Sequence, residues 1–253
     1  MRRRGSRLRT VGIKPFIITV YANPTFKVPF WFGSGTQRIT SIEHDITIVH
    51  DGTFTNTILS FSSAGEYDIE IWGNENDKTA FNFYTQSSDA SRLRDIKQWG
   101  TALWHKTNLI FRFTNGFNSI LSYTDAPRFP KDTDFIFAST FRDSNFNGKM
   151  NDWETNGRLV SLDACFYLNN LFNQDISGWN VTGLTGNAGN LFLSRSLAYS
   201  FLDNVYNAWS QQNVQTGVSI HFGVNSKYTS EGQAGRDILT GTFGWIITDG
   251  GLI

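Results

Sequence analysis

A recurring pattern of phenylalanine and tryptophan in the middle of the chain constrains the fold more than any other feature. The segments Phe146–Trp153 and Phe172–Trp179 both read Phe-Asn, five residues, Trp. A second series keeps nearly the same step, at Phe141, Phe166 and Phe192. Periods of about 20 to 29 residues are typical of leucine-rich-type solenoids, whose units bury their apolar faces only by stacking.

The composition agrees with a turn-rich β or solenoid protein. The chain has 253 residues, of which 22 are Phe, and its charged fraction of 17% lies below the roughly 25% of an ordinary domain. A composition this rich in Phe and this poor in charged residues argues against a helical bundle or a coiled coil. The sequence contains no apolar run long enough for a transmembrane helix, so we expect no membrane span.

Before the recurrence, the sequence alternates with the period of a β-strand. Glu66–Ile71 places acidic and apolar residues in strict alternation, which indicates a strand with one buried face. Further strands are expected at Phe16–Tyr21, Thr25–Phe32, Asp45–Val49 and Thr57–Phe61. Short strands at this spacing predict a small antiparallel sandwich.

The end of the chain differs from the recurrence and predicts a closing cap. Leu197, Phe201, Leu202 and Tyr206 fall at helical spacing, and a second helix is expected from Ser230 to Leu239 with Ser230 as its N-cap. A short strand should follow around Trp245–Ile247. Atypical terminal units are expected wherever a stack of repeats must end in water.

The predicted fold class is therefore mixed β and α/β. We divide the chain into a basic arm (residues 1–11), a small β-sandwich (12–86), a short leucine-rich-repeat-like solenoid (92–225) and a C-terminal cap (226–253).

The formal charge of zero hides an asymmetry between the arm and the body. Five arginines lie in the first nine residues, and the rest of the chain holds 17 basic against 22 acidic residues; the arginines are Arg2, Arg3, Arg4, Arg7 and Arg9. Three interpretations of the arm stay open: a solvated tail, a dock onto an acidic neighbour in an assembly, or a contact with nucleic acid. We take the dock as the working hypothesis and do not expect a nucleic-acid partner.

Residues that bear chemistry form no recognisable catalytic or metal-binding pattern. The single cysteine, Cys165, precedes one of the recurring phenylalanines and is interpreted as a buried apolar residue. The four histidines show no ligand spacing. We therefore predict no cofactor, no metal and no enzymatic activity, although a pair of carboxylates for glycoside hydrolysis would leave no trace in the sequence.

One segment matches a calcium-binding pattern formally. Residues 143–154 fit the twelve-residue EF-hand loop, with Gly148 at position six and Glu154 at position twelve. However, Phe146 and Trp153 are expected core positions, and the aligned segment of the next copy loses the ligands. We interpret the segment as a polar turn of the solenoid.

The N-terminal sequence does not predict export by the general secretory route. The apolar run Phe16–Ala22 is short for a signal peptide, and Lys14-Pro15 interrupts the approach to it.

The stretch Leu171–Thr185 and the closing Gly244–Gly251 resemble the BspA-like leucine-rich-repeat surface proteins of mycoplasmas, other bacteria and bacteriophages, from about Arg92 to Ile253. In that family a small β-sandwich that resembles a PKD or immunoglobulin-like module often precedes the repeats, so the resemblance implies an immunoglobulin- or PKD-like sandwich at residues 12–86. Phe61–Ile71 is similar to the last hairpin of such a module, although its usual Trp-Gly-Asp-Gly turn is missing here. The resemblance implies adhesion or attachment and transfers no catalytic residues.

Phage structural proteins assemble in the cytoplasm and are released by lysis, so they need no export signal. A sequence that resembles attachment proteins and lacks an expected export signal therefore fits a phage virion protein. We therefore expect a non-enzymatic virion component, such as a fibre, a knob or a head or tail decoration, located in the virion. Its expected partners are other virion proteins, through the arm and sandwich, and a host-surface glycan or protein; we also expect a homo-oligomer. The alternatives are a bacterial or mycoplasmal cell-surface adhesin and a polysaccharide-cleaving tail protein.

Overall fold

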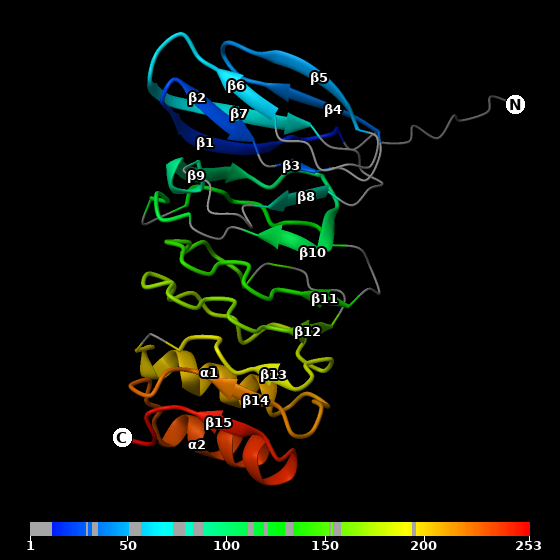
Figure 1. Cartoon of the computed structure of the whole chain (residues 1–253). Coiled ribbons are helices and arrows are strands. Elements are labelled where there is room, and N and C mark those ends of the chain that lie inside the picture. Colours follow the sequence, from blue (N-terminus) through cyan, green and yellow to red (C-terminus); the bar gives the residue numbers. More distant parts are fainter. Residues whose placement is uncertain are drawn as a thin grey trace, which may run out of the picture.

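The computed structural model describes residues 12–28, 30–31, 35–50, 57–72, 79–82, 89–110, 114–118, 121–129, 134–151, 153, 158–193 and 196–253. The described chain is mostly β-sheet with few helices, which confirms the mixed class. Figure 1 shows the N-terminal strands at one end of the molecule and the C-terminal helices at the other, and from about residue 93 onward the chain descends between these ends in sequence order.

The N-terminal part consists of short strands in three sheets. The strands are β1 (Phe16–Ala22), β2 (Thr25–Val28), β3 (Phe30–Trp31), β4 (Gly35–Thr40), β5 (Asp45–His50), β6 (Thr57–Ser60), β7 (Gly65–Trp72), β8 (Thr79–Asn82), β9 (Leu93–Gln98) and β10 (Trp104–Ile110). One sheet has the order β5-β4-β7-β1-β9, a second has the order β10-β8-β3, and a third pairs β2 with β6.

Acidic and apolar residues alternate along β7, and the apolar residues lie on the buried face of the largest sheet, as the sequence predicts. Ile69 and Ile71 are fully buried, whereas Glu66 and Asp68 are exposed. Ile18 of the central strand β1 lies directly opposite Ile69 in the antiparallel register. Burial of these side chains supplies the hydrophobic driving force that fixes the register of the strands.

Two details of this part differ from the prediction. The single strand expected at Thr25–Phe32 is wrong, because β2 pairs with β6 whereas β3 pairs with β8 in another sheet. Pro29 lies between β2 and β3 and has no backbone N–H to donate to a ladder. The strands Gly35–Thr40 and Thr79–Asn82 were not predicted.

Strand β9 joins the N-terminal sheet to the layers that follow. It pairs antiparallel with β1 on one side. On its other side, the carbonyls of Arg94 and Ile96 accept the backbone N–H groups of Asn118 (2.8 Å) and Tyr123 (3.1 Å). The expected division between residues 86 and 92 is thus crossed by continuous backbone hydrogen bonding.

Beyond β9, each stretch of chain lies against the next one in parallel. The strands here are β11 (Phe135–Ile136), β12 (Leu159–Ser161), β13 (Asn187–Ala188), β14 (Ser219–His221) and β15 (Ile246–Thr248). β11 pairs with β12, and β13, β14 and β15 form a parallel sheet. Between the first two layers, Phe137 N–H donates to the Ser161 carbonyl (3.0 Å) and Phe141 N–H to the Cys165 carbonyl (2.9 Å).

A column of stacked phenylalanine rings runs through these layers. The ring centroids of Phe141 and Phe166 are 5.5 Å apart with planes at 10°, and those of Phe166 and Phe192 are 5.0 Å apart at 4°. Phe222 extends the column, 6.4 Å from Phe192. The three phenylalanines aligned in the sequence therefore share one buried core.

The helical segments are η1 (Ala90–Arg92), α1 (Tyr199–Trp209), α2 (Ser230–Asp237) and a π-helical turn, η2 (Ile238–Thr242). The predicted apolar face of α1 is confirmed, since Phe201, Leu202 and Tyr206 are buried. None of the helices in the described ranges is long and apolar enough to cross a membrane.

The predicted N-cap of the last helix is wrong by one residue. Thr229 is the cap, because its backbone is extended and its side chain accepts the N–H of Glu231 (3.2 Å). The Thr229 N–H and hydroxyl in turn donate to the buried carboxylate of Asp203 in α1, at 2.9 and 2.8 Å. Asp203 thereby fixes where α2 begins.

Glycines on α2 allow the two helices to approach closely. A Cβ atom on Gly232 would lie 2.4 Å from Oδ1 of Asp203, and one on Gly235 would lie 2.5 Å from the backbone oxygen of Tyr206. Such distances exclude a side chain unless the helices move apart.

We expect Gly235→Ala to lower the free energy of unfolding by about 1–3 kcal/mol, because the added methyl group must separate α1 from α2. Urea denaturation measures the change. Gly241→Ala is the matched control, because a Cβ atom there has no neighbour within 4 Å. Equal stability of the two variants would contradict the close packing.

Candidate binding site

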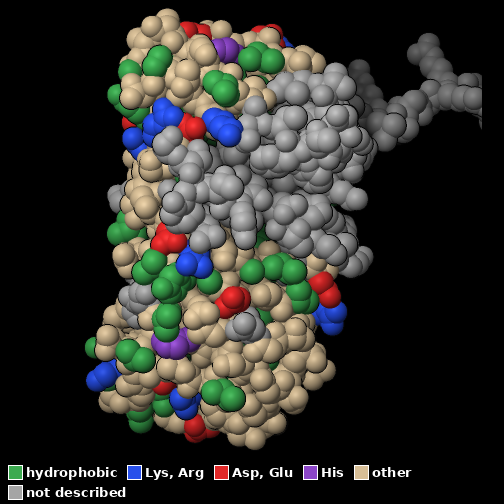
Figure 2. All heavy atoms as spheres, viewed as in Figure 1, with side chains coloured by type: hydrophobic (Ala, Val, Ile, Leu, Met, Phe, Trp, Pro, Cys, Tyr) green, Lys and Arg blue, Asp and Glu red, His purple; other side chains and the backbone are tan. Residues whose placement is uncertain are grey.

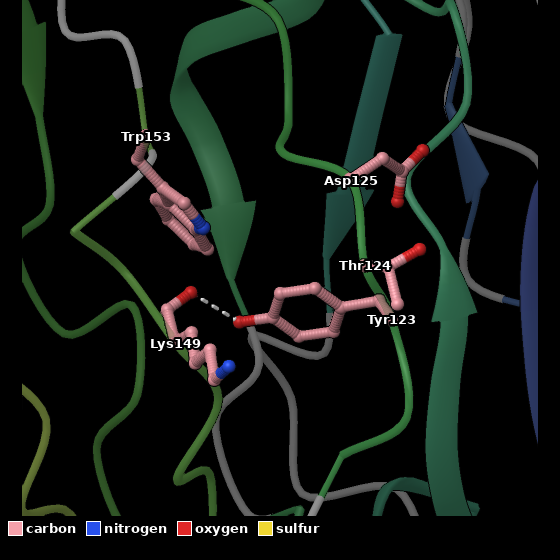
Figure 3. Close-up of a pocket in the computed structure, with 5 residues that line it drawn as sticks. All are labelled: Tyr123, Thr124, Asp125, Lys149 and Trp153. Atoms are coloured by element: carbon pink, nitrogen blue, oxygen red, sulfur yellow. Dashed lines mark hydrogen bonds between the residues drawn. The ribbon is translucent and has the colours of Figure 1, made fainter.

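A small hollow opens between two adjacent layers in the middle of the molecule. Its volume is about 130 Å³, and its lining residues are Tyr123, Thr124, Asp125, Lys149 and Trp153. Figure 3 shows that the first three lie on one segment of the chain and the last two on the next.

Asp125 is held by the layer above it. Its two carboxylate oxygens accept the backbone N–H groups of Trp99 and Gly100, each at 2.8 Å. Gly100 has a positive φ of 73° and lies against Pro15, whose oxygen would be 2.4 Å from a Cβ atom. A glycine is therefore required at this turn, and the turn presents its N–H groups to Asp125.

Tyr123 is held by the layer below it. Its hydroxyl donates to the backbone carbonyl of Lys149 at 2.6 Å, as Figure 3 shows. The ring lies so close to Gly148 that a Cβ atom there would be 2.1 Å from the hydroxyl oxygen. The absence of a side chain at Gly148 is thus what lets Tyr123 reach across the layer.

Trp153 forms the deep wall of the hollow. Its side chain is only 4% exposed, and its ring makes an edge contact with Trp99, with centroids 5.3 Å apart. The buried indole N–H has no hydrogen-bond acceptor in the described part of the chain. In Figure 3 the indole nitrogen is turned toward the side where Thr124 and Asp125 lie.

The hollow has the chemistry of a binding site for a polar molecule. Thr124 and Lys149 offer hydrogen-bond donors, and the remaining lone pairs of Asp125 offer acceptors. The rings of Tyr123 and Trp153 add apolar surface. The residues that the structure describes contain no cluster of three or more His, Cys, Asp or Glu side chains that could hold a metal ion.

A second, wider hollow of about 480 Å³ lies on the N-terminal sheet, lined by Thr19, Ile42, Glu66, Tyr67, Asp68 and Lys97. Here Asp68 already accepts hydrogen bonds from the Thr19 hydroxyl and the Lys97 ammonium group, both at 2.7 Å. These contacts link β1, β7 and β9 across the sheet face. We interpret this hollow as a structural surface.

The predicted docking residues Arg2, Arg3, Arg4, Arg7 and Arg9 lie outside the described residues. Cys165 is fully buried, and burial raises the pKa of its thiol well above the ordinary value. Its interpretation as an apolar core residue is confirmed.

The segment with the calcium-loop pattern uses its amide groups to join layers. Asn145 donates to the backbone carbonyl of Asn115 (2.6 Å), and the side-chain oxygen of Asn147 accepts from the Asn173 N–H (3.0 Å) and the Gln174 amide (3.1 Å). Glu154 lies outside the described residues. These bonds favour the interpretation as a polar turn.

Sequence reasoning did not find the hollow, although one signal was available. The aligned segments read Phe-Asn-Gly148-Lys149 in one layer and Phe-Asn-Gln174-Asp175 in the next. The glycine at position 148, where the next segment has Gln174, marks the layer against which the Tyr123 ring packs. The residues of the hollow come from two segments, however, and nothing in the sequence alone brings them together.

Comparisons with known proteins give one match. Residues 131–232 match a family described as "Mycoplasma protein of unknown function, DUF285", which is related to the BspA-like repeat proteins. The match covers less than half of the chain and includes Lys149 and Trp153 but not Tyr123. No curated protein and no solved structure matches the chain.

We expect Gly148→Ala to displace the Tyr123 ring and to lower the free energy of unfolding by about 1–3 kcal/mol. Chemical denaturation measures the loss. Gly178→Ala is the control, since its added methyl group would meet nothing within 4 Å. A Gly148→Ala variant as stable as the control would show that Tyr123 does not pack as described.

We expect neither calcium nor EDTA to change the melting temperature, because Asn145 and Asn147 are engaged between layers. A real site at 100 times its Kd would add about 2.7 kcal/mol of stability. Differential scanning calorimetry in excess calcium and in EDTA distinguishes the two cases, and a calcium-dependent rise would restore the EF-hand interpretation.

Proposed function

We propose that the chain is a non-enzymatic recognition protein of a bacteriophage particle. In this proposal the basic arm and the N-terminal strands face the particle, and the layers from β11 onward project outward to contact the host surface. The N-terminal strands then form an immunoglobulin- or PKD-like sandwich, and the layers form a short leucine-rich-repeat-like solenoid whose cap is α2 and β15.

The hydrogen bonds between layers support the solenoid part of the proposal. Ser139 N–H donates to the Asp163 carbonyl (2.9 Å) and Asp143 N–H to the Tyr167 carbonyl (2.8 Å), so both bonds span the same length of chain. The offset is longer near the C-terminus, where Phe192 N–H donates to the His221 carbonyl and Phe222 N–H donates to the Thr248 carbonyl. Parallel pairing of successive layers at offsets in this range is what stacked repeats of slightly unequal length produce. The family match, which includes residues 134–193, points the same way.

The observation that carries the functional proposal is the preorganised polar exterior of the layers. Asn190 donates to the Asp163 carboxylate in the preceding layer (3.1 Å), and Gln215 donates to the Thr182 carbonyl (2.9 Å). Such bonds fix short amide side chains before any partner arrives, which reduces the entropy lost on binding. A rigid surface of this kind suits recognition.

The exterior is also weakly charged, as a contact surface for uncharged partners would be. On the face in Figure 2, acidic and basic side chains stand in small groups among other polar side chains and backbone, with no large field of one sign. Many identical weak contacts would act together if the chain forms the homo-oligomer that we propose.

A second candidate is a mycoplasmal or bacterial cell-surface adhesin, which the match to a Mycoplasma family favours. Both candidates use the same outward surface and differ in what the N-terminal part attaches to. The location of the chain therefore decides between them.

We expect mass spectrometry to find the chain in gradient-purified phage particles from a lysate that carries its gene. If the arm docks onto an acidic neighbour, replacing its five arginines by glutamine should release the chain from particles, because the charges that hold it are lost. Replacement by lysine keeps the charges and is the matched control.

Absence of the chain from particles, together with its recovery in the membrane or cell-wall fraction of a bacterium, would contradict the virion proposal and support the adhesin. Retention of the glutamine variant in particles would contradict the docking role of the arm.

A further inference from the structure

We propose that two copies of this chain pair through strand β5, edge to edge and antiparallel, so that one continuous sheet crosses the dimer. The inference rests on the homo-oligomer of the proposed function and gives that oligomer a surface. Three observations carry it: the free edge of β5, the direction of its backbone groups, and the fit of this edge to a second copy of itself.

Strand β5 is the outermost strand of the largest sheet. In the described part of the chain it pairs with β4 alone, and the pairing runs from Asp45 to His50 in one register without a bulge. The opposite edge of the sheet is occupied, because β9 accepts hydrogen bonds from Asn118 and Tyr123. Figure 1 shows β5 at the end of the molecule that is farthest from α2. The edge of this sheet that can accept a further strand is therefore that of β5.

The turn between β4 and β5 determines which backbone groups of β5 face outward. Beside the turn, Ser41 and His44 exchange two backbone hydrogen bonds, at 2.9 and 3.4 Å. Hydrogen-bonded and non-hydrogen-bonded pairs alternate along an antiparallel ladder, so the even-numbered residues of β5 direct their N–H and C=O groups toward β4. The odd-numbered residues, Asp45, Thr47 and Val49, direct theirs to the free edge.

This edge lacks the features by which sheet edges usually avoid pairing. Every residue from position 46 to position 49 is β-branched, and the strand contains neither proline nor lysine. The carboxylate of Asp45 accepts two hydrogen bonds from the guanidinium group of Arg38 in β4, at 2.7 and 2.8 Å, so its charge is compensated within the same copy. Addition of a strand to such an edge is a recurring mode of protein recognition.

The edge of β5 is complementary to itself. In antiparallel pairing about a two-fold axis at Thr47, this residue faces Thr47 of the second copy, and Asp45 faces Val49 of the second copy. Every outward N–H and C=O group of the strand then has a partner, whereas any other register leaves some of them unpaired. No like charges lie opposite each other, because Asp45 meets a valine. This self-complementarity favours a second copy as the occupant of the edge.

The small size of the contact sets the expected strength of the dimer. A single pair of short strands buries less than the roughly 1,200–2,000 Å² of a stable interface, so we expect a Kd in the micromolar range. Because β5 lies at the end farthest from α2, the layers of the two copies stay free at opposite ends of the dimer. Each dimer would thus present two recognition surfaces, which adds avidity without a tight contact.

The test is sedimentation velocity of the full chain over a range of micromolar concentrations, in which we expect a dimer to form as the concentration rises. Thr47→Lys should weaken the dimer about tenfold or more, because two ammonium groups meet at the two-fold axis. Thr47→Val, the matched control, keeps the β-branched shape and should leave the Kd unchanged within about twofold. An equimolar mixture of Thr47→Lys and Thr47→Glu should restore a dimer with one copy of each, because opposite charges then meet.

A monomer at every concentration would overturn the inference, even if an extended segment of another virion protein proved to bind at β5. Equal dimerisation of Thr47→Lys and Thr47→Val would overturn it as well, as would a mixture of the Lys and Glu variants that stays monomeric. Thr47 is exposed, so each variant should fold, which circular dichroism checks. A monomeric chain that is found in particles fails this inference alone, whereas a dimeric chain that is absent from particles fails the proposed function alone.

Discussion

The stacking of aromatic rings between layers is the interaction on which the rest of the structure depends. Short strands of two or three residues, such as β11 and β12, have too few hydrogen bonds to hold a layer by themselves. Phe166 contacts Phe141 above it and Phe192 below it, so each layer is stabilised by both of its neighbours. The rings are nearly parallel and fully buried, so their stacking reinforces the backbone hydrogen bonds that join the same layers.

Buried polar groups fix the turns around this core. Asn169 is 1% exposed, and its side chain accepts the N–H groups of Leu171 and Phe172 and donates to the Phe146 carbonyl of the layer above. Bonds of this kind satisfy backbone groups that a short turn would otherwise bury unpaired. The candidate site lies where the packing between layers differs, because the absence of a side chain at Gly148 leaves room for the Tyr123 ring between two layers. One scaffold can thus present a regular exterior and a single hollow.

Much of the fold could be predicted because its signals are local or periodic. The alternation in Glu66–Ile71 marks the central sheet, and the step between Phe141 and Phe166 marks the shared core. The division of Thr25–Phe32 between two sheets could not be predicted, since the choice of partner strand depends on contacts far apart in sequence. The hollow was missed for the same reason: Asp125 is oriented by a turn at Gly100, and no local pattern connects them.

Amide hydrogen exchange on a Phe166→Leu variant tests most directly the claim that the layers share one core. The substitution removes a ring from the middle of the column at a cost of about 1–2 kcal/mol. If the layers depend on one another, the amides of Phe141 and Phe192, which bond to Cys165 and His221, will exchange faster together with that of Phe166. Faster exchange confined to residues 158–185, with Phe141 and Phe192 still protected as in the unmodified chain, would contradict the account.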